Sequence, residues 1–327
     1  MFIGSKKGVA LNEIDKLLDD NEIKHVFFKG SVIKDIYPVP ELRTMGDIDI
    51  LVDGENTERI KKILINNGYD FDNIFSYTGV MDFKKNNILF EVHTSLVYEE
   101  FKQGMGLIKY FKDYFKKTFK IKNYQYGLNV NDHFIYLVAH LSKHYYTGGS
   151  GIRMFLDIAI YMNYYKDILD KEYIETEAKK IGLYKFLCLT NELCSLWFGS
   201  AKIFDDFFVS DELLEQIEDY VFNGGIFGMH NDDNYSHKMM SLYTGKEDRI
   251  SRLKIICCYL FPSDEHMRSW CSWYSKVPKV LLPISWIYRI IYVVFMRKEN
   301  VLIHAKKVMS DSKELDVKYL FLKKSGL

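Results

Sequence analysis

The stretch Gly46-Asp47-Ile48-Asp49-Ile50 places two acids in alternation with two large apolar residues. Alternate side chains of a strand point to the same face. We therefore expect Asp47 and Asp49 to share one face of a strand, while Ile48 and Ile50 enter a core. Two neighbouring carboxylates repel each other unless a cation lies between them. The stretch predicts a divalent-metal site, and the apolar neighbours disfavour the alternative of an exposed acidic edge or turn.

Two other segments extend this prediction. The apolar run Val26-Phe27-Phe28-Lys29-Gly30-Ser31 ends in Gly-Ser, which is typical of a strand that stops at a tight turn. Backbone N–H groups of such a turn and the Ser31 hydroxyl can meet an anion. Glu91 lies inside the apolar run from Ile88 to His93, where a lone carboxylate is costly unless it is paired or metal-bound. Glu91 is therefore the expected third acid of a two-metal phosphoryl-transfer centre, unless it is an ordinary surface residue.

Two cations flank the expected centre. Lys29 and Arg43 are positioned in the sequence to neutralise charge on a triphosphate. The alternative for these cations is an ion pair with Glu41 or Asp35.

Three histidines and a further arginine are candidates for the acceptor side. His93 follows Glu91 on the same strand face and is expected to orient it, to contact the acceptor or to be structural. His140 and His144 are four residues apart and share a helix face, where they line the cleft or pack internally. They lack the His-Glu-x-x-His pattern of zinc proteases. Arg153 follows a glycine-rich loop that can close over a nucleotide, or it pairs with Asp157 on a helix surface.

The chain resembles the nucleotidyltransferase superfamily with the polymerase-beta-like fold. The residues that carry this resemblance are Gly30-Ser31, Asp47-Ile48-Asp49-Ile50 and Phe90-Glu91-Val92. It is more similar still to an uncharacterised bacterial nucleotidyltransferase family, and that family shares the long gap between Gly-Ser and the first acid. The similarity to this family lies in Lys29-Gly30, Tyr37-Pro38, Arg43, Gly46 to Val52, Glu91-Val92-His93, His140…His144 and Leu282-Pro283…Trp286…Arg289.

The order of expected elements agrees with the fold that the resemblance implies. That fold is α+β: a polymerase-beta-like nucleotidyltransferase domain with a small mixed sheet and helices, followed by a mostly α-helical domain. We place the catalytic domain at residues 1–125 and the helical domain, which would form the acceptor side of the cleft, at 126–327. Helices are expected at 10–21, 31–37, 57–66, 152–165, 171–181, 184–198, 211–221 and 251–260, and strands at 25–29, 48–52, 77–84 and 87–93.

Composition narrows the choice of partner and compartment. Lys plus Arg and Asp plus Glu number 44 each, and this balance argues against a long nucleic-acid groove. It favours a small-molecule or protein acceptor. Five cysteines without zinc-ligand spacing indicate reduced thiols of a cytoplasmic protein. No signal peptide is expected in the segment from Met1 to Leu11.

Two stretches invite other interpretations. Lys109 to Lys122 is basic and aromatic, which favours an amphipathic helix with a lysine face and leaves RNA binding as the alternative. Val277 to Met296 is apolar, but it contains Lys279, Pro283 and Arg289 and is a poor membrane span. We expect a buried helix against the catalytic domain; the alternative is attachment to a membrane surface through Trp286, Tyr288 and Tyr292.

The motifs and the resemblance together predict a metal-dependent enzyme. It would transfer a nucleoside monophosphate from an NTP, with ATP the expected donor, to an acceptor hydroxyl or similar group and release pyrophosphate. Asp47, Asp49 and Glu91 would hold two Mg²⁺ or Mn²⁺ ions about 3.5–4 Å apart. The alternatives are a non-catalytic nucleotide-binding sensor or scaffold and an RNA-directed nucleotidyltransferase. A kinase is disfavoured, because neither a P-loop nor the protein-kinase motifs are present.

Overall fold

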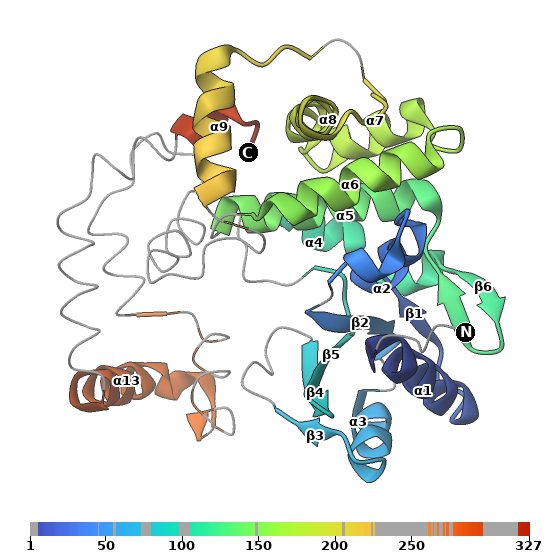
Figure 1. Ribbon diagram of the computed structural model, residues 1–327. Coiled ribbons are helices and arrows are strands. Elements are labelled where there is room, and N and C mark those ends of the chain that lie inside the picture. Colours follow the sequence, from blue (N-terminus) through green and yellow to red (C-terminus); the bar gives the residue numbers. More distant parts are fainter. Residues whose placement is uncertain are drawn as a thin grey trace.

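The described residues form a mixed sheet with helices on both faces (Figure 1). The structure is a computed structural model. It describes residues 6–44, 46–54, 57–72, 80–97, 105–147, 150–204, 207–223, 225, 261–262, 264, 267, 271, 273–274, 277–296 and 320–327. The predicted α+β class is confirmed.

Seven strands make up the sheet, in the order β3-β4-β5-β2-β1-β7-β6. Strand β2 lies near the middle, parallel to β5 and antiparallel to β1. Strand β7 runs parallel to β1 on its other side. The strand bounds are β1 His25–Phe27, β2 Asp47–Val52, β3 Asp70–Phe71, β4 Val80–Lys85, β5 Ile88–His93, β6 Phe119–Lys122 and β7 Gln125–Gly127.

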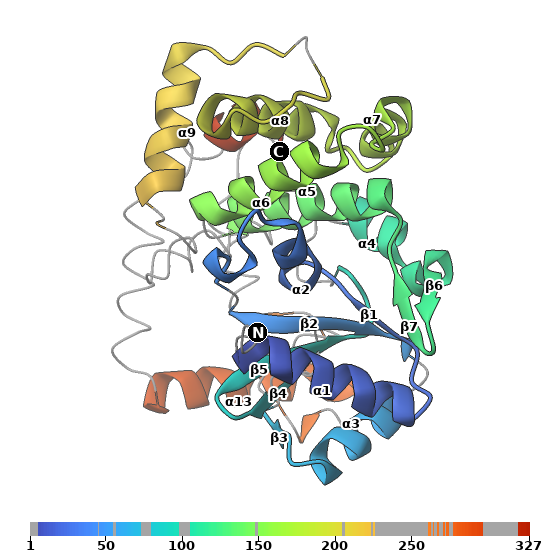
Figure 2. The same ribbon diagram turned by 45° about the vertical axis from the view of Figure 1, so that its right-hand side comes forward.

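One face of the sheet is covered by helices α1 (Lys6–Asp20) and α3 (Thr57–Asn66), as Figure 2 shows. Ile48, Ile50 and Val52 alternate along β2 and enter this core, where they are fully buried. The period-two pattern of apolar residues therefore sets which face of β2 packs against these helices. The acids between them are directed to the opposite face.

That opposite face carries a larger helical layer (Figure 2). The side chains of Phe28 and Leu51 point to this side of the sheet and pack in one core with the helices. A short helix follows β1 directly and lies beside β2, so the Gly-Ser turn is placed next to the two acids. The helices on this side are α2 Gly30–Ile33, α4 Met105–Phe111, α5 Val130–Thr147, α6 Ile152–Tyr165, α7 Lys171–Lys180, α8 Tyr184–Phe198 and α9 Asp211–Asn223.

Most expected elements lie where the sequence pattern placed them. The helices expected at 57–66, 152–165 and 184–198 have these bounds in the structure. The strand expected from residue 77 is described only from Val80, and the helix expected at 251–260 lies outside the described residues. The domain boundary expected after residue 125 stays a prediction; in the structure, this residue begins β7, a strand of the sheet.

The expected helix over Lys109–Lys122 is wrong. Helix α4 ends at Phe111, a 3-10 turn follows, and residues 119–122 form the edge strand β6. Phe119 and Ile121 alternate with Lys120 and Lys122, and aromatic and β-branched residues at period two favour a strand. The lysine-rich face that suggested RNA binding is therefore no continuous helix surface.

The C-terminal apolar stretch also differs from the expectation. Its helix α13 spans Leu282–Met296, after a 3-10 turn at Lys279–Leu281. The expected burial against the catalytic domain is not seen, because Ile284, Ile287 and Ile291 are each more than half exposed. The helix packs instead on a small separate core around Met267, Cys271 and Tyr274.

We expect His133 on α5 to make the protein acid-sensitive. Burial lowers the pKa of His133 to about 4. In the unfolded chain the same side chain is protonated below about pH 6.5, whereas in the folded protein it stays neutral down to about pH 4. Stability present above about pH 6.5 is therefore lost as the pH falls toward 4, by about 3 kcal/mol at most. His133→Phe keeps a ring against Tyr161 and should reduce the loss between about pH 7.5 and pH 5 in urea unfolding. An unchanged pH dependence would contradict this assignment.

Candidate metal and nucleotide site

The acids of β2 meet Glu91 across the parallel pairing of β2 with β5. Asp49 is opposite Glu91 in the register of the two strands, and Asp47 is opposite Leu89. Opposite residues of paired strands present their side chains on the same face. Asp47, Asp49 and Glu91 are thus brought to one face of the sheet, as the sequence predicted.

Asp49, Glu91 and His93 form the tightest group. The Nε2 atom of His93 lies 3.0 Å from Asp49 Oδ1 and 3.3 Å from Glu91 Oε2. One ligand atom from each of the three residues lies within 4.8 Å of the others, and within the described ranges no other His, Cys, Asp or Glu trio does so. Carboxylate oxygens that lie this close together suit a divalent cation, so the acids fit a metal, and the His93 Nε2 contacts hold their side chains in place.

Asp47 lies next to this group but is not part of it. Burial, together with the negative charges of Asp49 and Glu91, raises the pKa of Asp47 to about 6. Burial acts in the same direction on Asp49, but Lys29 and the hydrogen bond from His93 outweigh it and hold the pKa of Asp49 to about 2. The two acids of one strand therefore differ: Asp49 is a stable carboxylate, and Asp47 lacks a full counter-charge.

Lys29 supplies the cation at this point. Its Nζ lies 2.6 Å from Asp49 Oδ1, and both side chains are largely buried. The backbone of Lys29 has φ 51° and ψ −127°, which side-chain-bearing residues rarely adopt because of steric strain. This strained backbone at the N-terminus of α2 places the ammonium group of Lys29 on the carboxylate of Asp49.

Arg43 crosses from the loop before β2 to the helical layer. Its Nε and NH2 atoms donate to the two carboxylate oxygens of Asp157 on α6, at 2.8 and 2.7 Å, and Tyr37 donates to the same carboxylate at 2.6 Å. NH1 donates to the Gly30 carbonyl at 3.3 Å. A Cβ on Gly30 would lie 2.6 Å from that NH1, so Gly30 gives the guanidinium its space. Arg43 pairs with Asp157 rather than with the nearer acids that the sequence suggested.

Ser31 occupies the turn between Lys29 and the body of α2. The residue is 6% exposed, and its hydroxyl has no hydrogen-bond partner in the structure. A buried hydroxyl without a partner costs free energy, and such a group marks a place where a ligand oxygen can complete the bonding.

His140 and His144 lie on α5, on the side of the sheet that carries the acids. Their rings meet edge to face at 4.5 Å, and His140 stacks on Tyr136 at 5.9 Å. Burial, with a smaller contribution from nearby lysine charges that include Lys29, lowers the pKa of His140 well below its ordinary value and that of His144 to about 4. Both histidines are therefore neutral near pH 7 and lie within electrostatic reach of the acids and Lys29.

Arg153 approaches the first acid from the start of α6. Its NH1 donates to the Thr44 carbonyl at 2.8 Å, and its charge acts on Asp47 and on Lys7. Lys7 donates from α1 to the Gly46 carbonyl at 2.9 Å. The surface ion pair between Arg153 and Asp157 that the sequence allowed is replaced by the buried pair of Asp157 with Arg43.

Sequence reasoning missed Lys7 and Tyr136 near the centre, and it named Asp157 only as a surface partner of Arg153 rather than as the buried partner of Arg43. Lys7 is 39 positions from the residue whose carbonyl it contacts, and Asp157 is 114 positions from Arg43. Burial raises the pKa of Tyr136, and Lys29, Asp49 and Glu91 act on it as near neighbours. No local pattern marks any of the three, because each acts through a contact that the fold creates.

The family assignment agrees with this geometry. Residues 7–199 match a family model described as uncharacterised nucleotidyltransferase. The chain belongs to this nucleotidyltransferase family. The match includes the sheet, the acids, and helices α5, α6 and α8. It ends before the resemblance noted at residues 282–289.

Other comparisons add little. No curated protein matches the chain. One similar solved structure is a tRNA nucleotidyltransferase complexed with a primer tRNA and an incoming ATP analog. The two share 12% sequence identity, and the match covers 95% of this chain and 98% of that chain with a TM-score of 0.23. At this TM-score the likeness supports no argument about fold or acceptor.

We expect Asp157→Asn to destabilise the protein by about 3 kcal/mol, because it leaves the buried Arg43 without a counter-charge. The free energy of unfolding in urea measures the loss. The control is Asp72→Asn, which breaks the exposed pair with Lys84 and should cost less than about 1 kcal/mol. Equal effects of the two substitutions would show that Arg43 and Asp157 contribute no more than a surface pair.

Proposed function

We propose that this protein transfers a nucleoside monophosphate from an NTP, with ATP as donor, to an acceptor hydroxyl or similar group and releases pyrophosphate. The observation that carries the proposal is the convergence of Asp49, Glu91 and His93, with Asp47 beside them, in a member of a nucleotidyltransferase family. The acceptor is a small molecule or a protein. We place catalysis in residues 1–125 and the acceptor side in residues 126–327 of a cytoplasmic protein.

Asp47, Asp49 and Glu91 would hold two Mg²⁺ or Mn²⁺ ions. When bound, the ions supply positive charge that lowers the pKa of the acceptor and offsets charge developing at the α-phosphate. The raised pKa of Asp47 supports this role, because a carboxylate short of counter-charge gains most from a cation. His93 keeps the carboxylates of Asp49 and Glu91 in place through its Nε2 contacts.

The nucleotide would lie against the turn at Gly30 and Ser31. The Ser31 hydroxyl, which lacks a protein partner, donates to a phosphate oxygen. Lys29 lies at the boundary between the acids and this turn, and its ammonium balances phosphate charge together with Arg153. Arg43 would affect the nucleotide only indirectly. Its Nε and NH2 atoms are bound to Asp157, and its NH1 donates to the Gly30 carbonyl and so positions the turn.

The acceptor would approach along α5. His140 and His144 are neutral near pH 7, so an imidazole nitrogen there can accept a hydrogen bond from an acceptor hydroxyl. Because His140 and His144 are uncharged, they do not add positive charge beside the acids and the phosphates.

The reaction class can be tested without knowing the acceptor. The purified protein is incubated with each labelled NTP, Mg²⁺ or Mn²⁺ and cell lysate, and labelled products are identified by mass spectrometry. We expect a covalent NMP adduct and released pyrophosphate. Mg-NTP binding by calorimetry with no pyrophosphate release from any lysate would favour a nucleotide sensor or scaffold instead. Label found on tRNA would support the RNA-directed alternative.

We expect Asp49→Asn to lower NMP transfer by at least roughly a hundredfold, because the substitution removes the central charge of the site. Asp53→Asn, just beyond the same strand, is the matched control and should keep activity. Circular dichroism spectra of both variants should match that of the wild type. Retained transfer by Asp49→Asn would contradict the proposed centre.

Ser31→Ala should raise the KM for the NTP by about tenfold, because the lost hydroxyl bonds a charged phosphate. Its effect on stability should be small or favourable, since the hydroxyl has no protein partner. Ser142→Ala is expected to show the opposite pattern: its hydroxyl donates to the Ala139 carbonyl at 2.8 Å, so stability falls and KM does not change. Steady-state kinetics and urea unfolding measure both effects. An unchanged KM in Ser31→Ala would place the phosphates elsewhere.

A further inference from the structure

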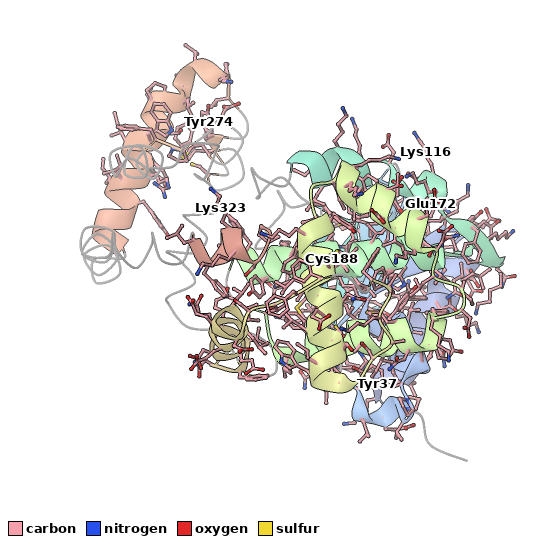
Figure 3. All side chains as sticks on the ribbon, turned by 90° about the horizontal axis from the view of Figure 1, so that it is seen from above. Tyr37, Lys116, Glu172, Cys188, Tyr274 and Lys323 are labelled. Atoms are coloured by element: carbon pink, nitrogen blue, oxygen red, sulfur yellow. The ribbon has the colours of Figure 1, made fainter. Side chains whose placement is uncertain are left out.

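Helix α13 (Leu282–Met296) contains none of the residues to which the proposed reaction assigns a role. Figures 1 and 3 show it to one side of the sheet and the helical layer, with Tyr274 in the same outlying part. Its inner side packs on Met267, Cys271 and Tyr274, and Trp286 donates to the Pro262 carbonyl at 2.8 Å. Ser285, on this inner side, is fully buried. The helix is thus fixed in orientation by its own small core.

The outer side of α13 is an apolar stripe. Its members recur at the three- and four-residue spacing of one helix face, and each is between 41% and 79% exposed. Contiguous exposed apolar residues at this spacing mark an interaction surface rather than a solvated one. The stripe consists of Val280, Ile284, Ile287, Tyr288, Ile291 and Tyr292.

The sequence around the stripe is mainly basic, although Glu299 follows it directly and Asp264 accepts a hydrogen bond from Tyr274 in the small core. Residues 275–298 contain five basic residues and no acid, in a chain whose total charge is zero. In the sequence, two of the five precede residues 282–296 and two follow them. Long basic side chains at both ends of an apolar helix can reach the head groups of a lipid surface while the apolar face is buried. The five are Lys276, Lys279, Arg289, Arg297 and Lys298.

The length of α13 restricts how it can meet a bilayer. The helix has 15 residues, whereas a spanning helix needs about 20. Among the described helices, none is long and apolar enough to cross a membrane. A helix with one apolar face, one inner face held by protein and basic ends is suited to lie in the plane of the interface.

We propose that α13 docks this protein on an anionic lipid bilayer, with the stripe of six residues in the acyl boundary and the basic charge of this stretch attracting the anionic head groups. Charge favours this occupant over a second copy of the chain, because two copies meeting through this face would bring two sets of five positive charges together. Tyr288 and Tyr292 carry their rings on the stripe, and tyrosine is a residue that interfaces between lipid and water favour.

Co-sedimentation of the full chain with vesicles, without nucleotide, tests the proposal separately from the reaction. The protein should pellet with vesicles of phosphatidylcholine and phosphatidylglycerol, and less with phosphatidylcholine alone or at high salt. The double variant Ile287→Ser and Ile291→Ser should lose at least about tenfold in partitioning. The matched control is Ile65→Ser with Ile168→Ser, two exposed isoleucines away from the stripe, and it should bind like the wild type.

Three outcomes would overturn the proposal. The first is that the wild type does not pellet with anionic vesicles. The second is that the stripe variant pellets with these vesicles as much as the wild type does. The third is that the wild type is a dimer in light scattering and the stripe variant a monomer, while neither binds vesicles. The last outcome would assign the stripe to a second copy. Unfolding curves of all variants should overlay that of the wild type, since the substituted side chains are exposed.

Discussion

The buried carboxylate of Asp49 is the constraint around which the candidate site is arranged. A charge 2% exposed in the middle of a sheet is tolerated only when other groups balance it. Lys29 and His93 do so from two different strand ends, at 2.6 and 3.0 Å. The strained backbone of Lys29 is a cost of this arrangement, because an ordinary β conformation would direct its ammonium elsewhere. The ammonium group of Lys29 is therefore a cation that the site already holds, which shows that the surroundings of Asp49 accept positive charge.

A second buried pair joins the catalytic sheet to the helical layer. Asp157 lies on α6, and its two oxygens hold the guanidinium of Arg43 from the loop before β2. Because NH1 of the same side chain reaches the Gly30 carbonyl, one residue positions the Gly-Ser turn, the start of β2 and α6 together. An ion pair of this kind has little net value for stability, but it restricts the geometry with which the two layers meet. The position of the acids of β2 relative to the histidines of α5 depends on that geometry.

The sequence predicted the parts of this structure that local periodicity controls. Alternation in β2 and β5 predicted which acids share a face, and apolar spacing predicted the bounds of α3, α6 and α8. The prediction of one helix over 109–122 failed because the end of this basic stretch pairs with β7. Its last four residues, Phe119–Lys122, form the edge strand β6. The sequence also could not identify the roles of Asp157, Tyr136 or Lys7, because these come from contacts between distant segments. The unpartnered hydroxyl of Ser31 is likewise visible only once its surroundings are packed.

The zero net charge of the chain conceals a separation of charge within it. Total balance argued against a long nucleic-acid groove, and that argument concerns the whole surface. Locally, three acids crowd one end of β2 and β5, while residues 275–298 have five basic residues and no acid. The acids need cations to be stable together, and the basic helix attracts anions. A composition that looks neutral therefore contains an acidic cluster in the sheet and a basic stretch around α13, and only the position of each charge along the chain and in the fold reveals the two.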